Sequence, residues 1–326
     1  MLSSFWAITK NSFIEIIRQP VYGILLLAGL VLIGLSPPIT MFSMAADESL
    51  MVDMGLATVF LLGLVVAVLS ATQVVSREIE SQTVGAIISK PVGRFSFVLG
   101  KFAAVSLAMA VCCYILATML LIVLRIGVPS AATWAVDGPA FAAALGPLLL
   151  AVAFGIYANY FYRWNFTSTA ILLALPLYTI AFAALLLVNG GFEFELFPKV
   201  FAERHAWQVA RAALLVFMGV WVLSSVAVVV STRLNVVMNA VICLTVFFVG
   251  TISQYLFGRF ADTFWPAWLA LRAIPSFHVF WVGDQLVAEV PYVPLPYIGA
   301  AAAYSIGFSA AMVFLAAFLF ERREVT

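Results

Sequence analysis

The stretch MGLATVFLLGLVVAVLSATQVV, residues 54–75, decides the fold class of this chain. It contains no charged residue, and its polar side chains are limited to threonine, serine and glutamine. A helix needs roughly 20 apolar residues to cross the hydrocarbon core of a bilayer, and this stretch reaches that length. A cluster of charges beginning at Arg77 follows almost at once. The stretch therefore predicts a helix that crosses a membrane and ends at a polar surface.

The composition of the whole chain agrees with a membrane location. Of its 326 residues, 65% are hydrophobic and 10% are charged, whereas soluble domains carry about 25% charged residues. A soluble fold of this length would expose much of that apolar surface to water. The formal net charge of +1 also argues against a nucleic-acid partner, which usually requires a basic surface. We expect an all-α membrane protein with a single transmembrane domain, residues 1–326.

Eight stretches come close to the length of a membrane span. They are Val21–Pro37, Met54–Val75, Phe102–Leu124, Phe141–Tyr162, Thr167–Val188, Ala212–Val230, Val236–Tyr255 and Pro296–Phe320. Only the short run from Ser231 to Asn235 separates the sixth from the seventh. We interpret that run as a tight hairpin, and one long broken helix is the alternative.

Eight spans place both termini on the same side of the membrane. Lysine and arginine favour the cytoplasmic side, so their distribution chooses the orientation. Of 16 such residues, six lie in the loops opposite the termini, namely Arg125, Lys199, Arg204, Arg211, Arg259 and Arg272. The side of the termini holds the other ten, which are Lys10, Arg18, Arg77, Lys90, Arg94, Lys101, Arg163, Arg233, Arg322 and Arg323. We therefore expect cytoplasmic termini in a plasma membrane, such as a bacterial inner membrane.

Three further segments are expected to lie at the membrane surface. Residues 1–20 carry apolar side chains near one helical face and polar ones on another, and Pro20 ends the pattern. They predict an amphipathic interfacial helix, and a fraying N-terminal extension is the alternative. Residues 190–211 and 257–293 are rich in phenylalanine and tryptophan, which favour the headgroup level. We expect short interfacial or re-entrant helices in both.

Residues 76–94, here called the coupling segment, hold the densest charge cluster in the chain. Glu78 and Glu80 suit the positive end of a helix dipole, and Ile87-Ile88 give the same helix an apolar stripe. Pro91 should end it, because the residue before a proline avoids helical geometry. The pattern predicts a short cytoplasmic helix between spans two and three that could dock in a groove of a partner. A solvated connecting loop explains the residues equally well.

A resemblance to a known protein family favours the docking helix over the solvated loop. The chain reads Arg77-Glu78-Ile79-Glu80-Ser81-Gln82-Thr83, then Ser89-Lys90-Pro91-Val92-Gly93-Arg94, then Leu99-Gly100-Lys101-Phe102. This resembles the signature loop of type-2 ABC transporter permeases, in which Lys-Pro-Val-x-Arg precedes a Gly-Lys that enters the next span. Gln82 stands where the family usually has glycine, and isoleucines replace its commoner leucines.

Two other regions are similar to the same family. Val228–Arg233 resembles its cytoplasmic Ser-Thr-Arg hairpin, and Phe320–Glu324 resembles its usual ending. The commonest members have six spans, whereas eight are predicted here. The extra pair would be Phe141–Tyr162 and Thr167–Val188. The family's translocation path is therefore not transferred to this chain.

The resemblance implies the permease subunit of an ABC transporter, most simply an exporter. Its partners would be a cytoplasmic ABC ATPase and a second permease, either another copy or a related chain. The residues expected to couple to the ATPase are Arg77, Glu78, Glu80, Ser81, Thr83, Ile87, Ile88, Lys90 and Arg94.

The chain lacks the Gly-x-x-x-x-Gly-Lys-Ser/Thr phosphate loop that ATP hydrolysis would need. We therefore expect no enzyme activity and no bound cofactor in this chain, with ATP and Mg²⁺ held by the partner subunit. His205 and His278 are far apart in sequence and fit an interfacial role better than a metal site. The alternative function is an ATP-independent membrane protein, either a scaffold or a passive facilitator of lipid-like molecules.

Two patterns inside the spans concern helix packing. The spans also contain mild polar residues that are expected to bond across helices, namely Ser70, Thr72, Gln73, Tyr157, Asn159 and Asn239. The last span also carries small residues at every fourth position, Gly299, Ala303, Gly307 and Ala311, here called the small-residue stripe. Small residues at this spacing let helix backbones approach closely. The stripe is expected to pack either within the chain or against another subunit.

Overall fold

A computed structural model describes residues 2–40, 47–80, 94–127, 137–203, 205–258, 265, 274–286 and 292–321. The described part is helical apart from short connections and one isolated β-bridge between Val188 and Phe194. The elements are α1 Leu2–Ile17, α2 Pro20–Gly34, α3 Ser36–Thr40, α4 Asp47–Glu80, α6 Arg94–Ile126, α7 Gly138–Tyr162, α8 Phe166–Leu185, α9 Lys199–Glu203, α10 Ala206–Ser231, α11 Val236–Phe257, η1 Phe277–Phe280, α13 Gly283–Leu286 and α14 Leu295–Glu321. The predicted all-α class is confirmed.

Seven of the described helices are long and apolar enough to cross a bilayer, namely α4, α6, α7, α8, α10, α11 and α14. They correspond to the second to eighth predicted stretches. The first predicted stretch, Val21–Pro37, is instead divided between α2 and α3 at Leu35. Pro37 and Pro38 lack the amide hydrogens that would continue α2, and they are tolerated only in the first turn of a new helix. The chain is thus a multi-pass helical membrane protein, and the eighth crossing stays a prediction.

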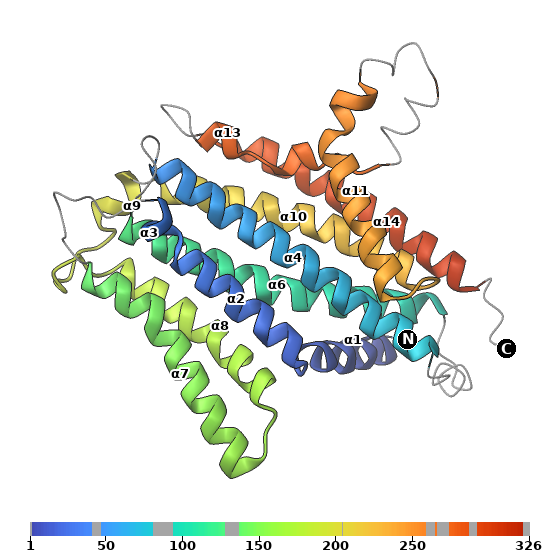
Figure 1. Ribbon diagram of the computed structural model, residues 1–326, viewed down its shortest axis with the longest axis horizontal. Coiled ribbons are helices and arrows are strands. Elements are labelled where there is room, and N and C mark those ends of the chain that lie inside the picture. Colours follow the sequence, from blue (N-terminus) through green and yellow to red (C-terminus); the bar gives the residue numbers. More distant parts are fainter. Residues whose placement is uncertain are drawn as a thin grey trace.

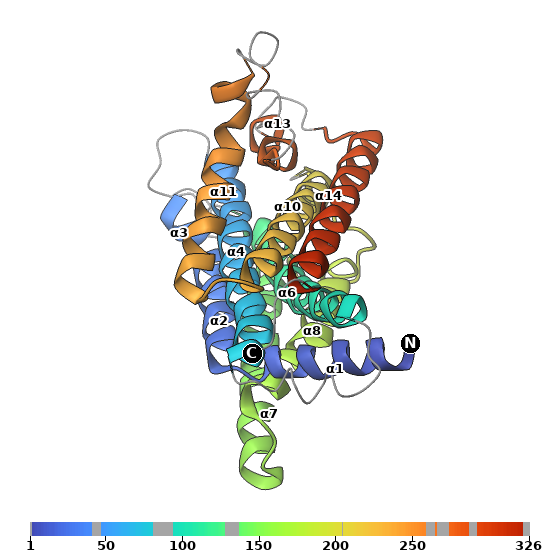
Figure 2. The same ribbon diagram turned by 90° about the vertical axis from the view of Figure 1, so that its right-hand side faces the viewer.

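The N-terminal helix turns sharply before α2. The helical parts Phe5–Ile17 and Pro20–Gly34 meet at a bend of 64°, at the point where Pro20 disfavours helical geometry in the residue before it. Figure 2 shows α1 running across one end of the bundle while α2 and α4 rise from it. The fraying alternative for residues 2–17 is wrong, because they form a helix. Its position at a membrane interface is still a prediction.

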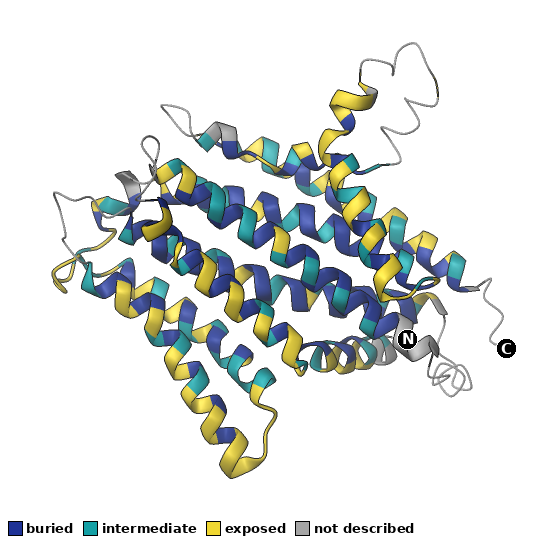
Figure 3. Ribbon diagram, viewed as in Figure 1, coloured by how far each residue is buried: buried dark blue, intermediate teal, exposed yellow. Residues whose placement is uncertain are grey.

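Three helices form the centre of the bundle. In the most apolar 18-residue stretch of each, 61% of α4, 67% of α6 and 72% of α10 is buried inside the protein. The same fraction is 33% for α7 and α14 and 22% for α8 and α11. Figure 3 shows this difference as mainly buried central helices and a largely exposed α7. The apolar faces of the outer helices therefore remain available to lipid.

Helices α7 and α8 form a hairpin that projects from the side of the bundle (Figure 1). Arg163 ends α7 in the left-handed conformation, with φ 56° and ψ 29°. Asn165 then caps α8 by accepting a hydrogen bond from the Ser168 amide. Inside the hairpin, the Tyr178 hydroxyl donates to the Ala144 carbonyl over 3.1 Å.

The connection between α10 and α11 is a hairpin, as predicted. Helix α10 ends at Ser231 and α11 begins at Val236, with Asn235 capping the Met238 amide. Arg233 in the turn donates to the Leu319 carbonyl over 2.7 Å, which ties the turn to the end of α14. The alternative of one long broken helix is wrong.

Both aromatic outer segments contain short helices among their described residues, α9 in the first and η1 and α13 in the second, and their position at a membrane interface stays a prediction. Within 190–211, only the five-residue α9 is a separate short helix, and the last six residues belong to α10. Within the described part of 257–293, Phe277 and Phe280 are buried rather than placed at a headgroup level. Gly250 leaves the space for Phe277, since a Cβ added at Gly250 would lie 2.7 Å from the Phe277 ring. Gly219 does the same for Phe280, which would lie 3.1 Å from a Cβ added at Gly219. The rest of this segment lies outside the described residues.

Candidate functional site

The coupling segment connects the two central helices α4 and α6. Helix α4 runs on to Glu80, so the backbone of Arg77, Glu78 and Glu80 forms its last turn. No glycine or proline lies between Val75 and Glu80, and the helix continues past the boundary predicted near Val75. Arg94 begins α6. The other predicted contact residues, Ser81, Thr83, Ile87, Ile88 and Lys90, lie outside the described residues, and so does most of the predicted coupling helix.

The N-terminal helix packs against the first turns of α6, next to the coupling segment. The Thr9 hydroxyl donates to the Gly100 carbonyl over 3.3 Å. Gly100 permits this approach, because an added Cβ would lie 2.9 Å from a methyl group of Ile8. The helix is therefore positioned by α6 as well as by the apolar residues of its own face.

Lys101 gives this contact a charged component that the sequence did not predict. The distribution of basic residues predicts Lys101 on the cytoplasmic side, just before the span Phe102–Leu124, yet Lys101 is only 2% exposed. The ammonium group donates to the Ser12 hydroxyl over 2.9 Å and lies 5.3 Å from the centre of the Phe97 ring. A buried charge is costly unless it is hydrogen-bonded. The contact thus fixes α1 to the start of α6, the helix that follows the coupling segment in the chain.

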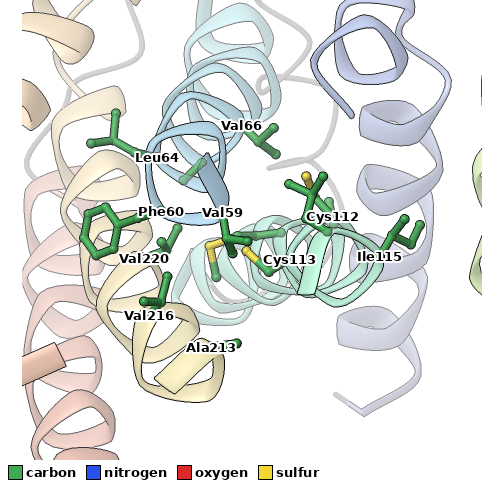
Figure 4. Close-up of a cluster of buried hydrophobic side chains, with 14 of the residues drawn as sticks. Val59, Phe60, Leu64, Val66, Cys112, Cys113, Ile115, Ala213, Val216 and Val220 are labelled. Atoms are coloured by element: carbon green, nitrogen blue, oxygen red, sulfur yellow. The ribbon is translucent and has the colours of Figure 1, made fainter. Parts of the chain in front are cut away.

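The central helices meet through close apolar packing. Gly63 of α4 faces Val220 of α10 and Cys113 of α6, and an added Cβ would lie 3.0 Å from Val220 and 3.2 Å from the Cys113 sulfur. Protein interiors are packed as densely as organic crystals and transmit strain. Figure 4 shows the side chains that surround this point, among them Val59, Phe60, Cys112, Cys113, Val216 and Val220.

A buried polar contact joins α11 to the same centre. The Asn239 side-chain amide donates to the Thr72 hydroxyl over 2.8 Å and to the Ala227 carbonyl over 3.2 Å. Both side chains are almost completely buried. The predicted bonding across helices is confirmed for Thr72 and Asn239, and it links α4, α10 and α11. Asn159, for which the same was predicted, donates instead to the Trp164 carbonyl in the turn that follows its own helix.

An apolar groove of about 560 Å³ opens between α6, α8 and α10. Leucine and alanine side chains supply much of its lining, together with Cys113, Tyr114, Thr118 and Phe217. At its edge the Tyr114 and Thr179 hydroxyls share a hydrogen bond of 2.8 Å between α6 and α8. The groove could not be predicted from the sequence, because its lining residues come from three helices that are apolar on every face.

The small-residue stripe lies on an exposed face of α14. Gly299, Ala303, Gly307 and Ala311 are all exposed, and a Cβ added at either glycine would meet nothing within 4 Å. Among the described residues the stripe therefore packs against no other helix of the chain. Contact with a further membrane-embedded subunit stays a prediction.

A buried ion pair closes the opposite end of the bundle. Arg125 at the end of α6 donates through Nε to the Asp137 carboxylate over 2.8 Å and through Nη1 to the Leu185 carbonyl over 2.6 Å. Asp137 also caps α7 by accepting from the Ala140 amide, and the guanidinium lies 5.6 Å from the centre of the Phe201 ring. The sequence offered no signal for this pairing beyond an Asp before Gly138-Pro139.

No protein-family model matches this chain, and a search of curated proteins finds no match to it. In the part of the chain that the structure describes, no group of three or more histidine, cysteine, aspartate or glutamate side chains is placed to hold a metal ion. The candidate functional site is therefore the end of the bundle where α4 ends at Glu80 and α6 begins at Arg94, with the coupling segment between them.

Proposed function

We propose that this chain is the permease subunit of a type-2 ABC transporter, with eight membrane crossings and both termini in the cytoplasm. The observation that carries the proposal is that the segment resembling the family's signature loop connects α4 and α6. These are two of the three most buried long helices among those described. A loop that joins two core helices can move the core, whereas a loop between peripheral helices would move only the periphery.

The contacts around this loop suggest how a displacement would spread. Helix α6 is tied to α1 through Lys101 and Ser12, and α4 is tied to α11 through Thr72 and Asn239. A separate ATPase would bind the coupling segment and supply the energy from ATP and Mg²⁺. Closure of the ATPase pair would push α4 and α6, and the elements bound to them would follow. Packed helices move as units because their interfaces deform little.

Two surfaces support the remaining parts of the proposal. The groove between α6, α8 and α10 is almost entirely apolar, which suits a hydrophobic or amphipathic substrate in an exporter. The exposed small-residue stripe on α14 suits close packing with a second permease. Both surfaces border helices that contact the core, so a movement of α6 or α10 would alter them.

The test is a pull-down of the tagged chain from membranes in mild detergent, followed by mass spectrometry and an ATPase assay. We expect an ABC ATPase to co-purify in a fixed ratio, and the double substitution Glu78→Lys/Glu80→Lys to abolish that association while the permease stays inserted. The matched control is Glu193→Lys/Glu195→Lys, which reverses two charges at the same spacing in the predicted outer segment.

Each outcome is informative. Loss of the ATPase with the first pair alone would support the coupling assignment. Equal loss with both pairs would indicate a general effect of charge and would contradict it. A chain that purifies without any ATPase from several detergents would favour the ATP-independent alternative, a scaffold or facilitator.

A further inference from the structure

A second, polar cavity lies where the α1–α2 bend faces the turn between α7 and α8. Its volume is about 520 Å³, and we call it the arginine pocket. The residues that line it are Arg18, Arg163, Trp164, Asn165, Ser168 and Thr169. The lining contains two positive charges and no carboxylate. It therefore has the chemistry of a site for an anion.

The two arginines come from different parts of the chain and are both exposed. In the described part of the structure, neither guanidinium has a hydrogen-bond or ion-pair partner. The Arg163 backbone is held by the turn itself, since Arg163 adopts the left-handed conformation and the Asn159 amide donates to the Trp164 carbonyl over 2.7 Å. Guanidinium groups in the lining of one pocket can form paired hydrogen bonds to a phosphate, which is the geometry arginine favours.

The other polar groups around the pocket, at the start of α8, are bonded to one another. The first amides of α8 have no partners within the helix, and its N-terminus carries the positive end of the helix dipole. The Ser168 and Thr169 hydroxyls and the Thr169 amide already donate to the Asn165 carbonyl, and the Ser168 amide donates to the Asn165 side-chain oxygen, so the two arginines remain as the donors for a ligand. The side-chain nitrogen of Gln19, next to Arg18, is buried and has no hydrogen-bond partner among the described groups.

The tip of the α7–α8 hairpin carries the side chains typical of a headgroup region. Tyr157, Phe161, Tyr162 and Trp164 form a chain of ring contacts with centroid separations of 4.7–6.1 Å. All are exposed, and Tyr160 beside them is 80% exposed. Tyrosine and tryptophan concentrate at the level where lipid headgroups meet water. The pocket thus opens where a phospholipid would present its phosphate.

We propose that the arginine pocket binds the phosphate of an anionic phospholipid and thereby joins the α1–α2 bend to the α7–α8 hairpin. The ligand is a lipid rather than a soluble phosphate because the aromatic tip beside the pocket favours the membrane interface. Arg18 and Arg163 neutralise the headgroup, and the lipid bridges two parts of the chain that otherwise meet through small contacts, such as Gly23 with Thr167. The proposal does not depend on an ATPase.

The experiment is native mass spectrometry of the full-length chain in mild detergent, titrated with phosphatidylglycerol or with phosphatidylcholine of the same acyl chains. Each basic residue near a membrane surface contributes to anionic-lipid binding by an amount that corresponds to about a fivefold change in affinity. We expect Arg18→Gln or Arg163→Gln to weaken phosphatidylglycerol binding about fivefold, and the double substitution to weaken it about 30-fold. Phosphatidylcholine binding should not change.

Two controls make the result specific. Lys10→Gln removes an exposed charge from the same helix α1 without touching the pocket, and it should leave binding unchanged. Arg18→Lys/Arg163→Lys keeps the charge but loses the paired hydrogen bonds, so it should bind between the wild type and the glutamine double variant.

Three results would overturn the proposal. The first is an equal loss with Lys10→Gln, which would show general attraction to negative charge. The second is unchanged binding in the double glutamine variant, with folding verified by size-exclusion chromatography. The third is displacement of the lipid by millimolar inorganic phosphate, which would assign the pocket to a soluble phosphate.

Discussion

The central helices and the α7–α8 hairpin are made of the same kinds of residue but are used differently. In α4, α6 and α10, well over half of the most apolar stretch is buried against other helices, whereas in α7 and α8 it is a third or less. Water would force such exposed apolar faces together, but lipid does not. The comparison teaches that apolar character places a helix in the membrane but does not by itself decide whether the helix joins the core.

Arg125 makes a polar connection between these two regions at the end of the bundle opposite the coupling segment, and breaking it should have the largest effect. Asp137→Ala would leave the guanidinium buried without its carboxylate, at a cost of about 3–5 kcal/mol in unfolding free energy. Chemical denaturation in detergent would measure it. The double variant Arg125→Met/Asp137→Ala should recover much of the loss, because it removes the uncompensated charge. A double variant as unstable as the single one would contradict this account.

The packing difference can be tested with one substitution made in each region. Gly63→Leu inserts a side chain between α4, α6 and α10 and should cost about 3 kcal/mol, the upper part of the usual range for overpacking. A Cβ added at Gly146 of α7 would have no neighbouring atom within 4 Å. Gly146→Leu should therefore be neutral or stabilising by up to about 1 kcal/mol. Thermal melts of both variants make the comparison. Equal losses would show that α7 is as tightly packed as α4.

The attachment of α1 to the core should depend on the hydroxyl that receives the Lys101 ammonium. Ser12→Ala removes that acceptor and should cost about 1.5 kcal/mol, because the hydrogen bond involves a charged group. Hydrogen exchange of residues 2–17 should rise with it. Asn11→Ala, an exposed neighbour, is the control and should change neither quantity. An unchanged exchange rate in Ser12→Ala would show that packing alone holds the helix.

The smallest effect is expected where the hairpin contacts the core beside the apolar groove. Tyr114→Phe removes the hydrogen bond to Thr179, and hydrogen bonds between helices in membranes contribute about 0.6 kcal/mol on average. Tyr160→Phe serves as the reference, because its hydroxyl is on the exposed tip. A difference between the two variants above about 2 kcal/mol would mean that this bond, rather than apolar contact, holds α8 to α6.

The sequence predicted the long helices well because their length is imposed by the bilayer and is written in continuous apolar runs. It also predicted the α10–α11 hairpin, where a short polar run with Arg233 and Asn235 interrupts such a pattern. It placed Lys101 in a loop and gave no partner for Arg125, because the partners Ser12 and Asp137 are fixed only by tertiary packing. The exposed side of α14 was undecided for a similar reason, since every face of that helix is apolar.

The contact between Lys101 and Ser12 also has a consequence for biosynthesis. The two residues are 89 positions apart in the chain, and ribosomes add about 5–20 residues per second. The N-terminal helix therefore waits for roughly 4–18 s before the residue it binds has been made. During that time α2 and α4 are synthesised, and α1 lacks the contact that fixes it to α6. The contact between Ser12 and Lys101 can therefore form only after α2, α4 and the start of α6 have been synthesised.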